Sequence, residues 1–391
     1  MKCKRLVSIL LACMMLASGA ALAGCSSGGT VVGRVNGEAI TEKDVNLFAD
    51  YILMQNAMTR AEIADAEEMK ILNENALETA VMFKLIVNRG KELKLYPLSG
   101  ANQKEVDEIV TQNADYLPEG MTKEELRGLE TKVKVLQLVT DEINKSVSVT
   151  DEELKAEYDA QVEFQKADYT ADPAMYEQAK TDGATVIVYK PEGYRYVKHI
   201  LIAFPEDVTG QILEAQYNGD AETVKKLRDE ALPQIQARAD EALSKVQAGS
   251  DFDALMAEYG EDPGMQAEPE SKTGYELGAA TDFVDEFKQA ALALASVGDT
   301  TGLVASDFGY HIIKWVGNVP SGAVAYDDVR EDLQASLLET KQGDAWNAEY
   351  EKWEAAAKIE KYPEKIPVKM VSPAPTIGEE ATSESDTTSE G

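Results

Sequence analysis

All three cysteines of this 391-residue chain lie within its first 25 residues. The chain beyond Cys25 therefore has no disulfide framework, no cysteine-held zinc site and no thiol nucleophile. Its length is too great for one ordinary core, and its hydrophobic content of 44 % is too high for a disordered chain. These limits predict two or three folded units that are stabilised without disulfides.

The charge balance is strongly acidic. The chain has 38 Lys and Arg residues against 70 Asp and Glu residues, which gives a formal net charge of −32. Such a chain repels phosphate backbones and offers no basic stripe that could follow them. We therefore predict no nucleic acid among its partners.

The first residues have the pattern of a secretory signal. A basic start precedes an apolar run at 6–23, and small residues and a cysteine follow it. A membrane span is the alternative, because the run is close to the lower limit of about 17 residues for a spanning helix. The alanine-rich composition and the cysteine at the cleavage point favour a signal peptide at 1–24.

The sequence LAGC at 22–25 resembles the bacterial lipobox. The resemblance implies that Cys25 becomes the first mature residue and carries two acyl chains, which anchor a protein stably where one chain does not. Residues 25–30 would then form a lipidated tether. The protein would be a lipoprotein at the extracytoplasmic face of the cell membrane.

The N-terminal half is predicted to be α-helical after a short strand at 31–35 and a turn at Asn36-Gly37. Helices are predicted from apolar spacing and N-cap signals after Thr41, at 66–93, at 122–144 and after Thr150. This half contains no catalytic constellation.

Helical spacing returns near the C-terminus, from Tyr326 to Trp353. An amphipathic helix of this length needs an apolar partner, and the N-terminal helices offer one. We therefore expect 31–160 and 323–365 to form one helical domain. The last segment, 371–391, has no basic residue and little apolar surface, so we predict a disordered acidic tail.

The middle of the chain has a mixed α+β pattern and is predicted to be a separate domain at 184–320. The β-rich stretches 185–190 and 193–204 flank a Pro-Glu-Gly turn and predict a hairpin. The acidic stretch 205–230 has no clear pattern. Further elements are predicted in this order: a helix from 235 that ends near Gly249, a short helix begun by Ser250 with Asp253, a helix from 284 closed by Gly298, and strands at 303–306 and 310–316.

Three stretches of this domain together resemble the parvulin peptidyl-prolyl isomerases. They are VKHILIAF at 197–204, FDALMAEYGED at 252–262 with GYELG at 274–278, and FVDEFKQAALAL with VGDTTGLVASDFGYHIIKW at 283–315. The flanking sequences VVGRVNGEAIT and VTDEELKAEY resemble the helical chaperone part of PrsA-like and SurA-like extracytoplasmic foldases. With the lipobox, the whole chain is most similar to the PrsA-like foldase lipoproteins.

The parvulin resemblance implies a set of site residues. The catalytic group comprises His199, Asp262, Ser306 and His311, and the apolar pocket for the proline ring comprises Leu277, Phe283, Phe287 and Phe308. The sequence departs from the family in a longer segment after the first strand, in extra residues between Asp262 and Gly274, and in GYELG, where GGDLG is commoner. These departures concern loops more than the site.

The chemistry agrees with these residue types. Rotation about an X-Pro bond loses amide resonance, at a barrier of about 18–20 kcal/mol, and needs neither nucleophile nor cofactor. An apolar cup and groups that favour the twisted amide accelerate it. His199 is two positions from Val197 and from Leu201, and His311 is two positions from Ile313, so the residues of each set point to the same face of a strand. The two histidines can therefore face one side of a sheet and share a hydrogen bond.

Simpler interpretations of the same residues remain. Each histidine could be a satisfied core residue, and Phe283 with Phe287 could be ordinary core at helical spacing. A metal site from the two histidines and Asp262 is disfavoured, because neither His-x-His nor His-x-x-x-His spacing occurs.

We therefore predict an α+β parvulin-type isomerase domain, a small antiparallel sheet with flanking helices, inserted in an α-helical chaperone domain. Its partners would be unfolded or partly folded secreted polypeptides with X-Pro bonds, and a homodimer is compatible with the sequence. The rival is a non-catalytic holdase that retains the parvulin fold. A solute-binding lipoprotein is a third hypothesis, but it needs two lobes of repeated βα units, and 31–150 shows no such alternation.

Overall fold

A computed structural model describes residues 29–114, 117, 121–183 and 185–370. The predicted signal peptide, the lipidation site at Cys25 and the acidic tail lie outside these residues. The chain forms two compact units, one from the described residues up to Ser148 and from Glu339 onward, the other from Val149–Leu338. In the part of the chain that the structure describes, no helix is long and apolar enough to cross a membrane.

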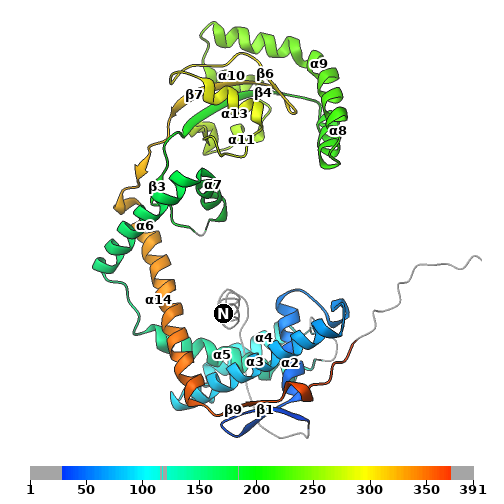
Figure 1. Cartoon of the computed structure of the whole chain (residues 1–391), viewed down its shortest axis with the longest axis vertical. Helices are drawn as coiled ribbons and strands as arrows, with labels where there is room; N and C mark the ends of the chain where they lie inside the picture. The colour runs from blue at the N-terminus through cyan, green and yellow to red at the C-terminus, as the bar shows by residue number, and fades with distance from the viewer. Residues whose placement is uncertain (1–28, 115–116, 118–120, 184, 371–391) are drawn as a thin grey trace, which may run out of the picture. The chain divides into compact units, whose positions relative to one another are not determined.

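The first unit is built from both ends of the chain. Strand β1 (Val31–Val35) pairs with β2 (Glu38–Thr41) on one side and with β9 (Ile359–Lys361) on the other, both antiparallel. In Figure 1 the blue and red ends of the chain lie side by side in this sheet. The strand β9 was not predicted, because three residues carry too little periodicity to stand out from a loop.

Four helices complete the first unit: α2 (Glu42–Gln55), α3 (Ala66–Glu92), α4 (Gly100–Gln112) and α5 (Lys123–Asn144). Three of them agree with the predicted ranges, whereas α4 was missed. Their starts follow local chemistry: the Asp44 backbone N–H donates to the Thr41 hydroxyl at 3.3 Å, and the Thr41 N–H donates to the Asp44 carboxylate at 2.9 Å. Phe48 and Phe83 stack at 5.2 Å in the core.

Of three further helices, α6 (Asp151–Ala171) and α7 (Pro173–Asp182) belong to the second unit, and α14 (Tyr326–Ala356) includes residues of both units. The boundary falls within α14. Its early residues Val329 and Leu333 pack with Leu154 of α6, and its later residue Trp346 belongs to the core of the first unit. The compact units divide at 148 and 338, whereas the sequence-based domain limits lie at 160 and 323, so the assignment of α6 to a functional domain stays a proposal.

The second unit contains a four-stranded antiparallel sheet in the order β5-β4-β7-β6. Its strands are β4 (Arg195–Ala203), β5 (Tyr275–Leu277), β6 (Val304–Ser306) and β7 (Gly309–Asn318). Its helices are α8 (Glu206–Tyr217), α9 (Ala221–Gln247), α10 (Phe252–Tyr259), α11 (Pro263–Gln266), α12 (Glu270–Thr273) and α13 (Asp285–Ala293). The predicted α+β class is confirmed.

Both faces of β4 are covered, and each face has its own cluster. Ile200 and Ile202 pack with Phe252 and other residues of α9 and α10 on one face. Val197 packs with Phe287 and Ala291 of α13 on the other. Because side chains alternate along a strand, the face under α13 is the one that carries His199.

The predicted hairpin of 185–190 with 193–204 is wrong. Strand β3 (Tyr189–Lys190) pairs instead with β8 (Gly322–Ala323), far away in the sequence. The side chain of Gln165 on α6 supplies the missing bonds: its amide donates to the Val186 carbonyl at 2.7 Å and its oxygen accepts from the Val188 N–H at 2.9 Å. A side chain from another element therefore replaces a strand neighbour, which local periodicity cannot reveal.

Three smaller differences concern helices of the second unit. The stretch 205–230, for which the sequence predicted no structure, forms α8 and the first part of α9. The N-cap of α10 is Asp251, whose carboxylate accepts from the Ala254 N–H at 2.7 Å, so the predicted start at Ser250 is one residue early. Helix α13 ends at Ala293, several residues before Gly298.

The buried amide of Gln165 generates a stability prediction. Replacing it by leucine keeps the volume but leaves the backbone groups of Val186 and Val188 unpartnered, which costs about 1–3 kcal/mol for each buried group. We expect Gln165→Leu to lower the urea midpoint of unfolding, followed by circular dichroism. The exposed Gln178→Leu on α7 is the control, and equal midpoints for the two variants would contradict the prediction.

Candidate active site

The two histidines, the only ones in the chain, lie on neighbouring strands of the sheet. In the register of β4 and β7, His199 lies opposite Ile313 and Leu201 lies opposite His311. The histidines are therefore diagonal neighbours on one face, as period-2 alternation predicts. Each is 4 % exposed.

A continuous chain of hydrogen bonds links four of the predicted site residues. The Nε2 atom of His199 lies 2.7 Å from Asp262 Oδ2, and its Nδ1 lies 3.1 Å from Nδ1 of His311. The Nε2 of His311 lies 2.7 Å from the Ser306 hydroxyl, which also accepts from the Phe308 N–H at 3.1 Å. The structure thus brings His199, Asp262, His311 and Ser306 together.

The carboxylate at one end sets the direction of this chain. An ionised carboxylate only accepts, so His199 must donate from Nε2. A neutral His199 then accepts at Nδ1, His311 donates from its Nδ1, and Ser306 donates to the remaining ring nitrogen of His311. All three bonds are satisfied with two neutral imidazoles in opposite tautomers.

Backbone contacts place Asp262 at the end of this chain. The Glu261 N–H donates to the Leu201 carbonyl at 2.9 Å, which fixes the segment after α10 along β4. Asp262 is the N-cap of α11, and its Oδ1 accepts from the Gly264 N–H at 3.2 Å. Its side chain is 20 % exposed, so the carboxylate is the most accessible of the four linked groups.

Electrostatics shift the pKa values of two members of this network, Asp262 and His311. Burial raises the pKa of Asp262, but hydrogen bonds from His199 and Tyr275 outweigh burial and lower that pKa to about 2. Burial, aided by the neighbouring His199, lowers the pKa of His311 to about 3. Near neutral pH the site therefore holds an ionised Asp262 and a neutral His311.

Three aromatic side chains, Phe287, Phe283 and Tyr275, lie beside the histidines and are called the aromatic wall. The ring of Phe287 on α13 meets His199 and His311 edge-on, at 5.0 and 5.2 Å between centroids. Phe283 lies 5.4 Å from Phe287 and 5.3 Å from Tyr275. Phe283 and Tyr275 are half-buried, so these two rings offer accessible apolar surface.

The other predicted pocket residues differ in exposure. Leu277 has no exposed surface and Phe287 has only 2 %, so both support the wall from within the cluster under α13. Phe308 is half-buried in the turn between β6 and β7, next to Ser306. Their contact with a proline ring stays a prediction, as do the catalytic roles of the four linked residues.

Sequence reasoning missed Tyr275, whose hydroxyl donates to Asp262 Oδ2 at 2.8 Å. Gly264 makes this contact feasible, because a Cβ atom there would lie 1.8 Å from the Tyr275 hydroxyl. A signal for Tyr275 was present, since it precedes Leu277 by two positions and so shares its face of the strand.

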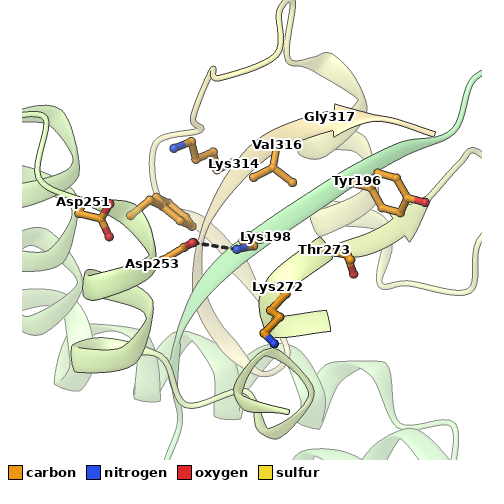
Figure 2. Close-up of a pocket in the computed structure, with 10 residues that line it drawn as sticks. Tyr196, Lys198, Asp251, Asp253, Lys272, Thr273, Lys314, Val316 and Gly317 are labelled. Carbon is orange, nitrogen blue, oxygen red and sulfur yellow. Dashed lines mark hydrogen bonds and ion pairs between the residues drawn. The ribbon is translucent and has the colours of Figure 1, made fainter. Parts of the chain in front are cut away.

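A separate pocket of about 300 Å³ lies on the other face of the sheet. Figure 2 shows Tyr196 and Lys198 of β4 lining it, with Lys198 paired to Asp253 at 2.9 Å. None of the four linked residues contributes to it. Across the described ranges, no group of three or more His, Cys, Asp or Glu side chains is arranged to hold a metal ion.

The profile of the rotamase family, the PPIC-type PPIase domain, matches residues 199–317. The match begins at His199, ends one residue before the end of β7, and includes all four hydrogen-bonded residues from Asp262 to Ser306. Residues 199–317 are therefore a peptidyl-prolyl cis-trans isomerase domain of the parvulin type.

The similarity extends over most of the chain. The chain is 26 % identical over 382 residues to foldase protein PrsA of Caldanaerobacter subterraneus subsp. tengcongensis, and the alignment covers 94 % of this chain and 99 % of that protein. It is 25 % identical over 359 residues to foldase protein PrsA of Clostridium botulinum strain Okra, covering 85 % and 88 %. Over most of its length the chain is therefore similar to the PrsA foldases.

Solved structures align with the chain at low scores. One of two SurA-like chaperones of Campylobacter jejuni covers 84 % of this chain and 98 % of its own, at 19 % identity and a TM-score of 0.29. PrsA of Bacillus cereus covers 86 % of this chain and 90 % of its own, at 19 % identity and a TM-score of 0.23. Scores of this size do not establish a common fold.

The low pKa of His311 predicts a loss of stability in acid. Between pH 6.5, its ordinary pKa, and about 3, the unfolded chain binds a proton that native His311 does not, so the free energy of unfolding falls as the pH falls. Asp262 adds a second loss between its ordinary value of 3.8 and about 2, because only the folded carboxyl remains ionised there.

The measurement is the thermal midpoint of wild type and His311→Asn between pH 7 and pH 4. Asparagine does not titrate, so we expect the variant to lose less stability than wild type across this window. Parallel curves for the two proteins would show that His311 does not carry the effect.

Proposed function

We propose that His199, Asp262, Ser306 and His311 form the isomerase site of an extracytoplasmic foldase that acts on X-Pro bonds of unfolded secreted polypeptides. The observation that carries this proposal is the hydrogen-bonded chain from Asp262 to Ser306, because it places both histidines of the molecule in one site within the matched domain. The aromatic wall beside it has the apolar character that a proline ring requires.

The carboxylate of Asp262, at the accessible end of the hydrogen-bonded network, explains how rotation would be favoured. A planar amide carries partial negative charge on its oxygen, and twisting the C–N bond removes the resonance that puts charge there. An ionised carboxylate close to that oxygen raises the energy of the planar form more than that of the twisted form. Asp262 would supply the charge, while the buried histidines hold its position and exclude water.

Hydrophobic contact with the proline ring of the substrate would supply the binding energy. Phe283 and Tyr275 present half-buried aromatic surface beside Asp262. A proline held against these rings keeps its C–N bond near the carboxylate, while the preceding residue remains free to turn. This division assigns binding to the wall and rate acceleration to the hydrogen-bonded chain.

The first test separates the enzyme from a holdase. We expect Asp262→Asn to lower isomerisation of a short X-Pro peptide on the order of tenfold or more, because the fixed charge is lost. His199→Ala and His311→Ala should also lower it, in part through lost site structure. Suppression of aggregation of an unfolded client should persist, since the first unit contains none of these residues.

The matched control is Asp251→Asn, which keeps a good N-cap on α10 and lies in the pocket on the opposite face. All variants should first be shown to be folded by circular dichroism. If the wild-type chain prevents aggregation but does not accelerate isomerisation, the holdase hypothesis is correct and the catalytic roles are wrong.

The lipid anchor is a proposal that rests on the sequence. Cleavage before Cys25 would leave one thiol in the chain, at the position where a lipobox places diacylation. We expect Cys25→Ser to release the protein from the membrane fraction into the soluble extracytoplasmic fraction. A variant that stays in the membrane pellet after a high-salt wash would support the membrane-span alternative. The homodimer also stays a prediction.

A further inference from the structure

Helix α7 packs against the strand that carries part of the aromatic wall. Tyr176 is 1 % exposed, and its ring meets Tyr194 edge-to-face at 5.0 Å. Its hydroxyl donates to Oε1 of Glu276 in β5 at 2.6 Å. Lys180, one turn further along α7, lies 3.5 Å from the same carboxylate oxygen. Helix α7 lies outside residues 199–317, which the isomerase family profile matches.

A second contact from α7 holds the loop after β5. Glu177 accepts a hydrogen bond from the Thr281 hydroxyl at 2.8 Å, and the same hydroxyl oxygen accepts from the Gly278 N–H at 2.9 Å. Gly278 is required for this approach, because a Cβ atom there would lie 2.6 Å from the ring of Tyr194. The segment 276–281 is therefore held at both of its ends by one helix.

The opposite side of this short segment faces the candidate site. Because side chains alternate along a strand, Tyr275 and Leu277 point away from the face that carries Glu276. Tyr275 donates to Asp262, and Leu277 packs beneath Phe287. Phe283 follows Thr281 by two residues and completes the wall. A shift of β5 would thus move the Tyr275 hydroxyl relative to the Asp262 carboxylate.

We propose that Tyr176 and Glu276 are positioning residues of the isomerase site, and that α7 is a working part of the isomerase although it precedes the family's domain. The proposal rests on the proposed function of the site. The contacts between α7 and the segment 276–281 are well suited to hold that segment in place. The two carboxylates of Glu276 and Glu177 are only 17 % and 19 % exposed, and each has a hydroxyl donor and a lysine beside it.

Loss of one hydroxyl tests this arrangement. Tyr176→Phe keeps the ring in its cluster but removes the donor to Glu276, which leaves that carboxylate with lysines at 3.5 and 3.6 Å. We expect kcat/KM for an X-Pro peptide to fall by about three- to tenfold, because small misplacements of site groups cost rate. Glu276→Gln should have an effect in the same direction.

The matched control is Tyr158→Phe on α6. Tyr158 is also buried, its hydroxyl donates to the backbone carbonyl of Val324, and it belongs to a different hydrophobic cluster from Tyr176 and Leu277. We expect its isomerase rate to equal that of wild type. A loss in Tyr158→Phe as large as in Tyr176→Phe would overturn the proposal, because general destabilisation would then account for both.

The second readout does not depend on activity. With ¹⁵N-labelled histidine, every imidazole signal of the full chain comes from the site, since the chain has only two histidines. We expect wild type to show His199 protonated at Nε2 and His311 at Nδ1, and Tyr176→Phe to shift the His199 signals by moving Tyr275 relative to Asp262. Unchanged histidine signals or an unchanged rate in Tyr176→Phe would overturn the proposal. If Tyr176→Phe shifts the histidine signals but the wild-type chain has no isomerase activity, the positioning contact is supported and the proposed function is refuted.

Discussion

The carboxylate of Asp262 is the fixed point of the site. Once it is ionised and both imidazoles are neutral, each successive hydrogen bond has only one direction that satisfies every atom, and that direction ends at the Ser306 hydroxyl. Two buried imidazoles without such an anchor could exchange tautomers freely, and their two facing nitrogens would at times both carry a proton or both lack one. A single surface-facing charge thereby determines the proton positions of a pair of buried rings. The cost of burying these polar groups is offset because none of the four linked side chains lacks a partner.

The sheet supplies the rigidity that this network requires. Strand β4 is covered on one face by α9 and α10 and on the other by α13, so its side chains cannot shift without disturbing a packed cluster. His199 and His311 are attached to the two central strands, and Ser306 is attached to the edge strand β6. Only Asp262 comes from a segment outside the sheet, and the backbone bond from Glu261 to Leu201 ties that segment to β4. The site is therefore formed largely by regular structure, with a single short loop element at its open side.

The sequence predicted those features that local chemistry decides. Capping boxes such as Thr41 with Asp44 and Thr150 with Glu153 involve residues three positions apart, and they appear as predicted. The alternation that places both histidines on one face is also local to each strand. The pairings and side-chain contacts that were missed join distant segments. Gln165 replaces a strand partner for Val188, β9 joins β1 across the length of the chain, and Tyr176 reaches Glu276 from a hundred positions away. The candidate site was largely predictable because the parvulin resemblance supplies its non-local pairing, whereas the contact of Tyr275 with Asp262 joins residues that neither the resemblance nor local spacing pairs.

The pairing of β1 with β9 also imposes an order in time. A chain that emerges from its N-terminus exposes β1 early, but the strand that completes this sheet and the aromatic residues of late α14 emerge last. The second unit lies wholly between these segments, so all of its residues are available before the first unit can close. Slow closure of the first unit would leave the apolar surfaces of α3 and α5 open for as long as the remaining chain takes to arrive. The protein would thus present, during its own maturation, the kind of unfinished apolar surface that foldases exist to manage.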